Sequence, residues 1–413
     1  MGTDHGTELK LLRPEEFDRW WDHLYRAFGG GPASTEEREL DKSVTEFDRS
    51  LAVWDGDVMV GTSGAFSFRM SVPGGAVVPT AGVTMVSVAA THRRRGVLTA
   101  MMRRLVDDAH AAGEPLAALF ASEPAIYGRF GFGAATFQLS AEIDTGRVAL
   151  ELPAGTDEVR VRYAAPAEVL DECEAVYAAL VPLRPGMLAR QPGWERAALL
   201  DPESERDGAS ALQCVVAERD GRITGYARFR TKTGWGPSGH DGTVSLADLA
   251  ALDPVTEAAL WRFLFGIDLM TTLRLRGRPV DEAWQHQVSD IRRCLPRLRD
   301  AGHIRLVDVG AALSARTYVA PVDVVFEVED AFCPWNAGRW RLTGDAKGAS
   351  CERTTDAADV ALSARELGAA YLGGVTLLSL AAAGRVRELR PGTLTEASVG
   401  FGSPVAPWLS HGF

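Results

Sequence analysis

Residues 86–105, VSVAATHRRRGVLTAMMRRL, decide the fold. A small apolar run typical of a strand leads into three arginines and a glycine, Arg93 to Gly96, and then into a helical pattern. A strand, a turn and a helix N-terminus leave backbone N–H groups unpaired at the start of the helix, where the helix dipole adds partial positive charge. The pattern is therefore that of an anion-binding turn, or else of a charged and solvated helix end.

The residues of this turn suit a phosphorylated ligand. Glycine at position 96 lets the backbone approach an anion closely, and arginines form charge-assisted hydrogen bonds with phosphate. Arginine at a helix N-terminus opposes the helix dipole, which weakens the alternative of a solvated helix end. The turn has no Gly-Lys-Ser/Thr of a Walker motif and lacks the three glycines of a dinucleotide fingerprint. On these four residues alone, the two interpretations are equally supported.

The composition is that of a globular protein with two or three domains. The chain has 413 residues, of which 46% are hydrophobic and 24% charged, and one domain usually takes about 150 residues. No stretch approaches the roughly 20 apolar residues of a membrane helix, and the N-terminus lacks the basic and apolar regions of a signal peptide, so we expect a cytoplasmic protein without a membrane span. The net charge of -11 argues against nucleic acid as a partner and mildly favours cationic substrates.

The cysteines do not predict a metal site. Five cysteines are scattered along the chain without a C-x-x-C pair or a histidine at metal-ligand spacing. We expect no bound metal, and free, packed thiols at Cys173, Cys214, Cys294, Cys333 and Cys351.

The first 150 residues combine helices with an antiparallel meander. Residues 8–27 predict a short strand and an amphipathic helix, and a second helix is expected from a Ser34 or Thr35 cap. Three strand-like runs follow, separated by Asp-Gly, Pro-Gly-Gly and Pro-Thr-Ala-Gly breaks, and they lead into a fourth strand over residues 83–88. A helix over about 96–112 and a buried strand, PLAALFAS, complete the region.

The same order recurs in the middle of the chain. Residues 211–232 repeat the apolar run, the Asp-Gly turn and the glycine-bearing return strand, and residues 243–268 stand where the opening stretch stood. We therefore predict a second copy of the first fold over about 155–295. In this copy the basic turn has become Asp253-Pro254-Val255-Thr256, so an anion site there would be lost and the copy is expected to be structural.

A third region is expected from about Ala301. Its pattern predicts strands at 304–309, 323–330 and 339–345 and a helix near 363–373. It contains neither a nucleophile motif nor metal-ligand spacing.

Two segments of the chain carry a family resemblance. Arg93-x-x-Gly96 resembles the acyl-CoA motif of the GNAT acetyltransferases, although Leu98 departs from its third glycine or alanine. VSVAATHRRRGVLTAMM, LFASEPAIYGRFGFGAAT and the final phenylalanine together resemble the enhanced intracellular survival (Eis) family of actinobacterial acetyltransferases, over the whole length. The resemblance implies an α/β (α+β) protein of tandem GNAT folds, each a mixed central sheet flanked by helices, followed by a domain like sterol carrier protein.

The resemblance also implies boundaries, a cofactor and an assembly. The expected parts are an N-terminal GNAT domain that binds acetyl-CoA (1–150), a second GNAT-like domain without a CoA site (151–298) and a sterol-carrier-like domain whose terminus reaches the active site (299–413). Acetyl-CoA would be the cosubstrate, and the chain would form a homo-hexamer.

Carried over by position, the resemblance assigns a set of cofactor residues. A strand end would pair with the pantetheine arm through backbone groups, the basic turn would hold the pyrophosphate, and two residues after the next strand would line the other side of the cleft. The set is Val86, Ser87, Val88, Arg93, Arg94, Arg95, Gly96, Val97, Leu98, Thr99, Ser122 and Glu123.

The resemblance implies two catalytic groups, Tyr127 as proton donor and the terminal carboxylate of Phe413 as general base. An amine must lose a proton before it attacks a thioester, and a tyrosine, with a reference pKa of about 10, can protonate a departing thiolate, whose reference pKa is about 8.5. An exposed α-carboxyl is a poor base for an ammonium, so the tail must fold back into the substrate cavity, anchored by Trp408 and Leu409. The alternative for Tyr127 is an ordinary packed aromatic residue, although ligands often approach glycine-rich loops such as the one it lies in. The alternative for the tail is that it packs only for stability.

Acceptor-binding residues are expected on the early helices, on strands that face the cavity and in the tail. They are Trp20, His23, Glu37, Phe66, Met85 and Gly412. Core packing is the alternative for the aromatic residues, and a solvated helix face is the alternative for Glu37. Gly412 replaces an acidic residue frequent in the family, and His411 is a candidate compensating base.

The resemblance implies an acetyl-CoA-dependent N-acetyltransferase for amines of cationic small molecules such as aminoglycosides, acting at several positions. Lysine side chains of peptides or proteins are a second class of acceptor. A non-catalytic protein that binds CoA or lipid is the competing hypothesis, and such a protein needs neither Tyr127 nor Phe413.

Overall fold

The computed structural model describes residues 6–30, 34–237 and 239–413. It divides into two compact units. Unit 1 takes the chain up to Thr136, the short segment Arg184–Ala189 and everything from Ala301 onward, and unit 2 takes Phe137–Leu183 and Arg190–Asp300.

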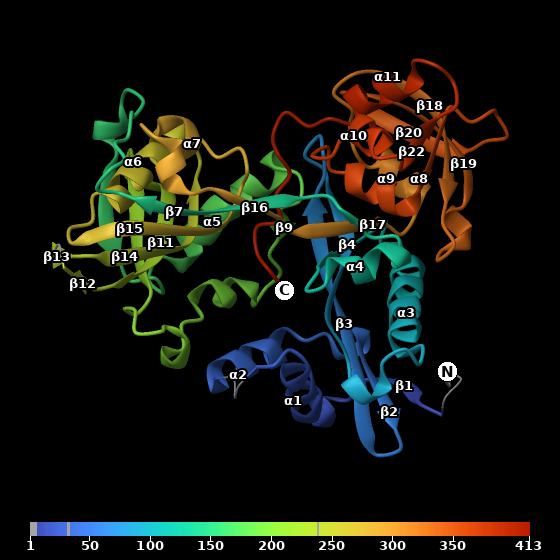
Figure 1. The fold of residues 1–413 in the computed structure, drawn as a ribbon, viewed down its shortest axis with the longest axis horizontal. Coiled ribbons are helices and arrows are strands. Elements are labelled where there is room, and N and C mark those ends of the chain that lie inside the picture. Colours follow the sequence, from blue (N-terminus) through green and yellow to red (C-terminus); the bar gives the residue numbers. More distant parts are fainter. Residues whose placement is uncertain (1–5, 31–33, 238) are drawn as a thin grey trace. The chain divides into compact units, whose positions relative to one another are not determined.

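Unit 1 contains a mixed sheet flanked by helices (Figure 1). Its strands, in spatial order, are β1 (Glu8–Leu11), β2 (Ser50–Asp55), β3 (Val58–Ser71), β4 (Val77–Val88), β5 (Leu116–Phe120), β17 (Gly302–Leu306) and β6 (Gly133–Ala134), with β9 (Leu188–Ala189) paired to β3. Its first helices are α1 (Phe17–Ala27), α2 (Thr35–Val44), α3 (Val97–Ala111) and α4 (Pro124–Tyr127). All the pairs in this sheet are antiparallel except β4 with β5.

The predicted helices form where the sequence pattern places them. The helical-spacing residues Phe17, Trp20, Trp21 and Leu24 are the buried face of α1. Ser34, the first of the two candidate caps, accepts a hydrogen bond from the backbone N–H of Glu37 and starts α2. α3 begins directly after Gly96, as the opening stretch predicts.

The predicted break at Pro79-Thr-Ala-Gly is wrong, because β4 runs without interruption from Val77 to Val88. Pro79 is exposed and lies one residue before the pairing of β4 with β5 begins at Thr80. A proline, which lacks a backbone N–H, is tolerated at such an edge position. The residue after the break, Gly82, is needed for packing rather than for a turn, because a Cβ there would collide with the ring of Phe68.

The strand predicted at 304–309 belongs to the first sheet rather than to the third region. β17 pairs antiparallel with β5, from Gly302 opposite Phe120 to Leu306 opposite Leu116, and on its other side it pairs with β6. In Figure 1 this orange strand stands among the blue and teal strands of the first sheet. All five residues of β17 are buried. An apolar run of this kind predicts a buried strand but does not reveal which strand it pairs with.

Unit 2 is built on a second mixed sheet. In spatial order its strands are β16 (Arg297–Asp300), β7 (Phe137–Asp144), β15 (Met270–Arg278), β14 (Gly242–Ala251), β11 (Arg222–Lys232), β10 (Gln213–Arg219) and β8 (Arg160–Ala164), and its helices are α5 (Leu170–Leu180), α6 (Pro254–Phe265) and α7 (Trp284–Gln287). The meander β10, β11 and β14, followed by α6 and the parallel strand β15, repeats the order of β2, β3, β4, α3 and β5. The expected boundary at residue 150 lies beyond β7, which pairs with β15 and so lies in the second sheet.

At the start of α6 a side chain accepts hydrogen bonds from the backbone N–H groups of the first turn. The carboxylate of Asp253 accepts hydrogen bonds from the backbone N–H groups of Val255 and Thr256, each at 3.0 Å, and from the Thr256 hydroxyl at 2.6 Å. The donors that would meet an anion are therefore already paired with a side chain of the protein.

The remaining part of unit 1 carries a sheet of its own. Its strands, in spatial order, are β20 (Gly348–Arg353), β19 (Gly338–Asp345), β18 (Val322–Glu329), β21 (Val360–Ser363) and β22 (Val386–Glu388), and its helices are α8 (Val309–Ser314), α9 (Ala364–Ala370), α10 (Leu377–Ala382) and α11 (Thr393–Gly400). β18, β19 and α9 confirm the elements predicted at 323–330, 339–345 and 363–373.

Replacing Asp253 by alanine should lower the free energy of unfolding by about 1 kcal/mol, because the cap of α6 is lost. Partial burial acts to raise the pKa of Asp253, but the hydrogen bonds from Thr256 and Val255 and the charge of Arg219 outweigh it and hold this pKa below its ordinary value. The contribution is thus present above the ordinary carboxyl pKa, and it is lost as the pH falls through the lower pKa of the folded state. Urea unfolding measures the difference in unfolding free energy between the wild type and Asp253→Ala, which should be smaller near pH 3 than at pH 7. An equal difference at both pH values would contradict the role of Asp253 as the cap.

Candidate functional site

The two central strands of the first sheet pair only briefly and then part. The parallel pairing of β4 with β5 covers Thr80 to Gly82 opposite Leu116 to Ala118. Beyond this point β4 continues to Val88, paired to β3 on its other side, while β5 remains paired to β17. Among the described strands none covers the edge of β4 from residue 83 to 88. The N–H and C=O groups of such an edge can pair with an extended ligand.

A bulge shapes this free edge. Met85 adopts a left-handed conformation (φ 54°) where the register between β3 and β4 shifts. The Thr62 hydroxyl donates to the carbonyl of Met85 at 2.8 Å, and its oxygen lies 2.7 Å from the hydroxyl of Ser87. A bulge of this kind re-aims the residues that follow it. Ser87 is buried, whereas its neighbours Val86 and Val88 are half-buried.

The basic turn at the end of β4 is open to solvent. Arg93, Arg94 and Arg95 are exposed, and positive φ angles alternate at Arg94 (62°) and Gly96 (78°). Gly96 is the N-cap of α3 and provides no side-chain cap, and a Cβ added to it would meet nothing within 4 Å. Glycine is therefore needed for its conformation, and no N-cap side chain accepts from the donors at the start of α3, unlike those of α6.

The first turn of α3 anchors the site from inside. Val97 is 1% exposed, and Leu98 is half-buried and packs against the core of the sheet. Leu98, which departs from the acyl-CoA motif, is therefore a packing residue in this structure. Thr99 is exposed on the same turn.

Tyr127 lies at the end of α4, a short helix that follows β5. Ser122 and Glu123, between the strand and the helix, are exposed, whereas Tyr127 is 9% exposed and meets the ring of Phe132 edge-on at 6.3 Å. Burial raises the pKa of Tyr127 above its ordinary value, and the carboxylate of Glu123 adds to the rise. The phenol is thus held in its protonated form.

The glycines after Tyr127 allow close packing against β17 and against residues of α9. A Cβ at Gly128 would come within 2.9 Å of the Arg365 guanidinium, and one at Gly131, whose φ is 82°, would collide with Arg305. Gly133 faces the backbone of α9 equally closely. The role of Tyr127 next to a bound ligand stays a prediction, and these three glycines have a packing reason of their own.

The C-terminal tail is docked along its length, as its apolar composition predicts. Trp408 and Leu409 are 9% and 2% exposed. The N–H of Trp408 donates to the carbonyl of Pro185 at 2.9 Å, and the guanidinium of Arg184 donates to the carbonyl of Ala406 at 2.7 Å. A Cβ at Gly186 would lie 2.9 Å from the carbonyl oxygen of Trp408.

The tail ends where β4 and β5 part. The Thr84 hydroxyl donates to a main-chain carboxylate oxygen of Phe413 at 2.8 Å. The Phe413 ring lies 5.0 Å from the Phe68 ring and 6.0 Å from the Phe120 ring. A Cβ at Gly82 would come within 3.2 Å of the Phe413 ring. The residue predicted as general base therefore lies between the two strands, close to the free edge of β4.

Two predicted acceptor residues belong to the aromatic cluster around α1. Trp20 is fully buried and donates its indole N–H to the carbonyl of Leu51 at 2.9 Å. Met85 packs against the aromatic cluster around α1, of which Trp20 is part. Trp20 thus belongs to the buried aromatic face of α1, whereas the half-buried Met85 packs against that face from β4, and a role of either residue in binding the acceptor stays a prediction.

The other predicted acceptor residues are distributed between the strands, the helices and the tail. Phe66 is 4% exposed and lies 5.7 Å from Phe68, next to the Phe413 ring. Glu37 is half-buried on α2. Gly412 is exposed, and nothing lies within 4 Å of a Cβ added to it.

His23 is an unusual group on α1. It is half-buried, and its Nε2 has no hydrogen-bond partner in the part of the chain that the structure describes. Burial lowers the pKa of His23, and the charge of Arg26 lowers it further. The imidazole is thereby kept neutral.

Sequence reasoning missed Gly82, Thr84, Phe120 and Arg184. Each of them contacts the docked C-terminal tail, which lies more than 200 residues further along the chain. A threonine or a glycine in a strand carries no local signal for a contact of this kind.

The described residues contain neither a group placed to hold a metal nor a membrane-spanning helix. Within residues 6–30, 34–237 and 239–413, no group of three or more histidine, cysteine or acidic side chains is placed to hold a metal ion. No helix among the described elements has the length and apolarity needed to cross a membrane. All five cysteines are free and buried, as predicted.

Comparisons with known proteins agree with this architecture. Residues 8–135 and 186–306 each match a family described as acetyltransferase (GNAT) domain, and residues 309–410 match sterol carrier protein domain. An uncharacterized N-acetyltransferase of Streptomyces coelicolor is 73% identical over 410 residues, which are 98% of this chain and 99% of the relative.

Relatives and structures of mycobacteria identify the family. N-acetyltransferase Eis of Mycobacterium tuberculosis is 35% identical over 381 residues, 88% of this chain and 89% of the relative. The crystal structure of Eis1 from Mycobacterium abscessus has a TM-score of 0.84 at 33% identity and covers 98% of this chain and 100% of that chain. With two GNAT domains, a sterol-carrier domain and these relatives, the chain is an N-acetyltransferase and belongs to the Eis family of GNAT acetyltransferases.

Proposed function

We propose that the protein transfers an acetyl group from acetyl-CoA to amines of cationic small molecules such as aminoglycosides, at several positions of one molecule. The observation that carries the proposal is the docking of Phe413 between Phe68 and Phe120, where β4 and β5 part. A tail held in this place brings a carboxylate to the end of the cleft, as a base for the amine requires.

The residues present fit acetyl-CoA. The free edge of β4 at Val86 to Val88 suits the amide groups of a pantetheine arm, and the exposed turn from Arg93 to Thr99 suits a pyrophosphate, because its donors are uncapped and its three arginines are exposed. Ser122 and Glu123 would line the opposite side of the cleft. In the second GNAT domain the carboxylate of Asp253 already accepts from the corresponding backbone donors. We therefore propose that the second GNAT domain binds no CoA and has a structural role.

The proposed chemistry needs one base and one acid. Acetyl-CoA supplies the thioester that the amine attacks and the thiolate that leaves. The Phe413 carboxylate accepts the proton of the amine, and the Tyr127 phenol gives its proton to the departing sulfur and regains one from solvent. The raised pKa of Tyr127 supports this role, because a donor must hold its proton until the thiolate develops.

The acceptor is expected to be cationic and small. The net charge of -11 attracts cations, and Phe66, His23 and Glu37 are our candidates for its surroundings. Gly412 offers no charge where the family often has an acid, so we propose that His411 beside it, 6.2 Å from Phe68, takes part in holding the amine.

Lysine side chains of peptides or proteins remain the second candidate acceptor. The alternative is a non-catalytic protein that binds CoA or lipid. One pocket of the third domain, with a volume of 320 Å³, has four charged residues in its lining, Glu329, Glu366, Arg385 and Arg387, and does not itself suit an apolar ligand. A cytoplasmic location and a homo-hexamer complete the proposal and rest on family membership and sequence alone.

Replacing Arg94 and Arg95 together by alanine should weaken acetyl-CoA binding by about tenfold to a hundredfold, because each charge-assisted hydrogen bond contributes about 1.5 kcal/mol. Calorimetric titration with acetyl-CoA measures the effect, which should shrink at high salt. Arg104→Ala is the matched control, since Arg104 lies on the same helix but is paired to Asp108. Equal affinities for acetyl-CoA in the double variant and the control would refute the proposal that Arg94 and Arg95 bind the pyrophosphate.

Tyr127→Phe should lower kcat by about a hundredfold or more, because general acid catalysis is lost, while the affinity for acetyl-CoA stays within twofold. Thiol release from acetyl-CoA is followed with an aminoglycoside, a polyamine and a lysine peptide. Because the pKa of Tyr127 is raised, the alkaline decline of kcat should begin above pH 10 or so, and the variant should lack it.

Two results of this experiment would count against the proposal. Absence of turnover with every amine, with intact binding of acetyl-CoA, would refute the enzyme hypothesis for these acceptors. Full activity of Tyr127→Phe would remove the tyrosine from the mechanism. Tyr163→Phe, at an exposed tyrosine of β8, is the control for a lost phenol.

Adding two glycines after Phe413 should impair catalysis, because the carboxylate moves away from Thr84. The expected result is a fall in kcat of about a hundredfold with unchanged acetyl-CoA affinity, measured by the same thiol assay. The same two residues added at the N-terminus are the control. Unchanged turnover in the extended chain would rule out the carboxylate as base.

A further inference from the structure

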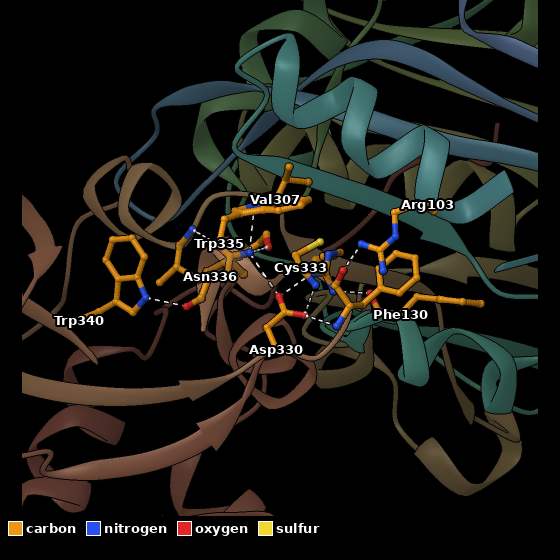
Figure 2. A network of polar contacts seen from close by, with 12 residues as sticks. Arg103, Phe130, Val307, Asp330, Cys333, Trp335, Asn336 and Trp340 are labelled. Atoms are coloured by element: carbon orange, nitrogen blue, oxygen red, sulfur yellow. Dashed lines mark hydrogen bonds and ion pairs between the residues drawn. The ribbon is translucent and has the colours of Figure 1, made fainter. Parts of the chain in front are cut away.

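A buried ion pair connects the first GNAT domain with the sterol-carrier domain. Arg305, on β17, is fully buried, and its guanidinium donates to the carboxylate of Asp330 at 2.6 Å and to the carbonyl of Phe130. Asp330 follows β18 and is 7% exposed. Figure 2 shows the Asp330 carboxylate within a network of polar contacts, and the side chains of the ion pair are 0% and 2% exposed.

The carboxylate of Asp330 also orders the chain that follows it. It accepts hydrogen bonds from the backbone N–H groups of Phe332 at 3.2 Å and Cys333 at 2.8 Å, and from the Asn336 amide at 3.3 Å. The same amide donates to the carbonyl of Val307, next to β17, at 3.1 Å. Residues 330–336 are therefore fixed to the strand that carries Arg305.

This arrangement also fixes the loop that carries Tyr127. Phe130, whose carbonyl accepts from Arg305, is three residues after Tyr127, and its ring meets that of Phe332 edge-on at 5.0 Å. The N–H of Phe132 returns to the carbonyl of Tyr127 at 3.3 Å. The backbone on the C-terminal side of the tyrosine is thus held by Arg305 of the first sheet and by the Phe332 ring of the sterol-carrier domain.

The same segment also contacts the helix of the basic turn. Arg103, on α3, donates to the carbonyl of Phe332, and its guanidinium lies 3.7 Å from the centre of the Phe332 ring. Phe332 therefore lies between α3, which would hold acetyl-CoA at its start, and the loop of Tyr127. A shift of this segment would change the distance between the phenol and the bound thioester.

Stability alone is a poor reason for this ion pair. Taking two charges out of water costs free energy that their attraction often fails to recover, so apolar residues of the same volume would stabilise a core as well or better. The Nε of Arg305 has, moreover, no hydrogen-bond partner among the described residues. What a buried ion pair adds is a unique orientation for the groups around it.

We propose that the Arg305–Asp330 pair is a positioning device for Tyr127, through which the sterol-carrier domain takes part in acetyl transfer. The pair holds the carbonyl of Phe130 and, with Phe332, fixes the tyrosine loop relative to α3. This inference rests on the proposed function of Tyr127 as the acid. Arg305 and Asp330 themselves touch no substrate.

Asp330→Asn tests the proposal, because it keeps the shape of the side chain and removes the charge. The expected result is a fall in kcat of about tenfold to a hundredfold, since a displacement of about 1 Å has that effect, with the affinity for acetyl-CoA within twofold. Glu282→Gln is the matched control: Glu282 pairs with Arg278 in unit 2, and both side chains are 6% exposed. The control should lower the melting temperature comparably and leave kcat unchanged.

A double-mutant cycle separates positioning from general loosening. If Asp330 acts through Tyr127, Asp330→Asn should cost little further activity in the Tyr127→Phe background. An equal fold loss in both backgrounds would overturn the proposal. Full activity of Tyr127→Phe by itself would instead overturn the proposed function, so the two failures are distinguishable.

Arg103→Gln provides a second variant if Asp330→Asn does not fold. It leaves no buried charge unpaired, because the partner of Arg103 is a carbonyl. We expect a smaller fall in kcat, again absent in the Tyr127→Phe background. A loss of equal size in that background would overturn the proposal here too.

Discussion

The site depends on the separation of β4 and β5 after only three paired residues. β4 keeps β3 on one side, and β5 keeps β17 on the other, so each strand leaves its neighbour without losing all its hydrogen bonds. The separation leaves a free strand edge on β4 and a place between the two strands where Phe413 docks. The proposed reaction depends on both features.

The two GNAT domains share a topology but differ at the corresponding helix start. In both, a strand leads through a short turn into a helix that crosses to a parallel strand. At Gly96 the donors at the helix start are left open by a residue without a side chain, and at Asp253 a carboxylate fills them. The N-cap side chain is therefore the clearest difference between the two helix starts, and our proposal of a phosphate site at Gly96 rests on it.

Local pattern predicted much of the fold and only part of the site. The periodicity of α1, the cap at Ser34, the glycine turn at 96 and the second copy were readable because each signal lies within a few residues. The pairing of β17 with β5, the docking of the tail on Arg184 and Pro185, and the reason for Gly131 could not be read. They join residues far apart in the chain, and an apolar strand or a glycine is compatible with many such partners.

The place of β17 has a consequence for how the protein is made. Until residues 302–306 have left the ribosome, β5 lacks its antiparallel partner and exposes an apolar strand edge. The N-terminal domain, though first to be synthesised, thus completes its sheet only after the whole second domain has been translated. An unpaired apolar edge of this kind can pair with another chain, so this interval of synthesis is the one in which the domain is exposed to aggregation.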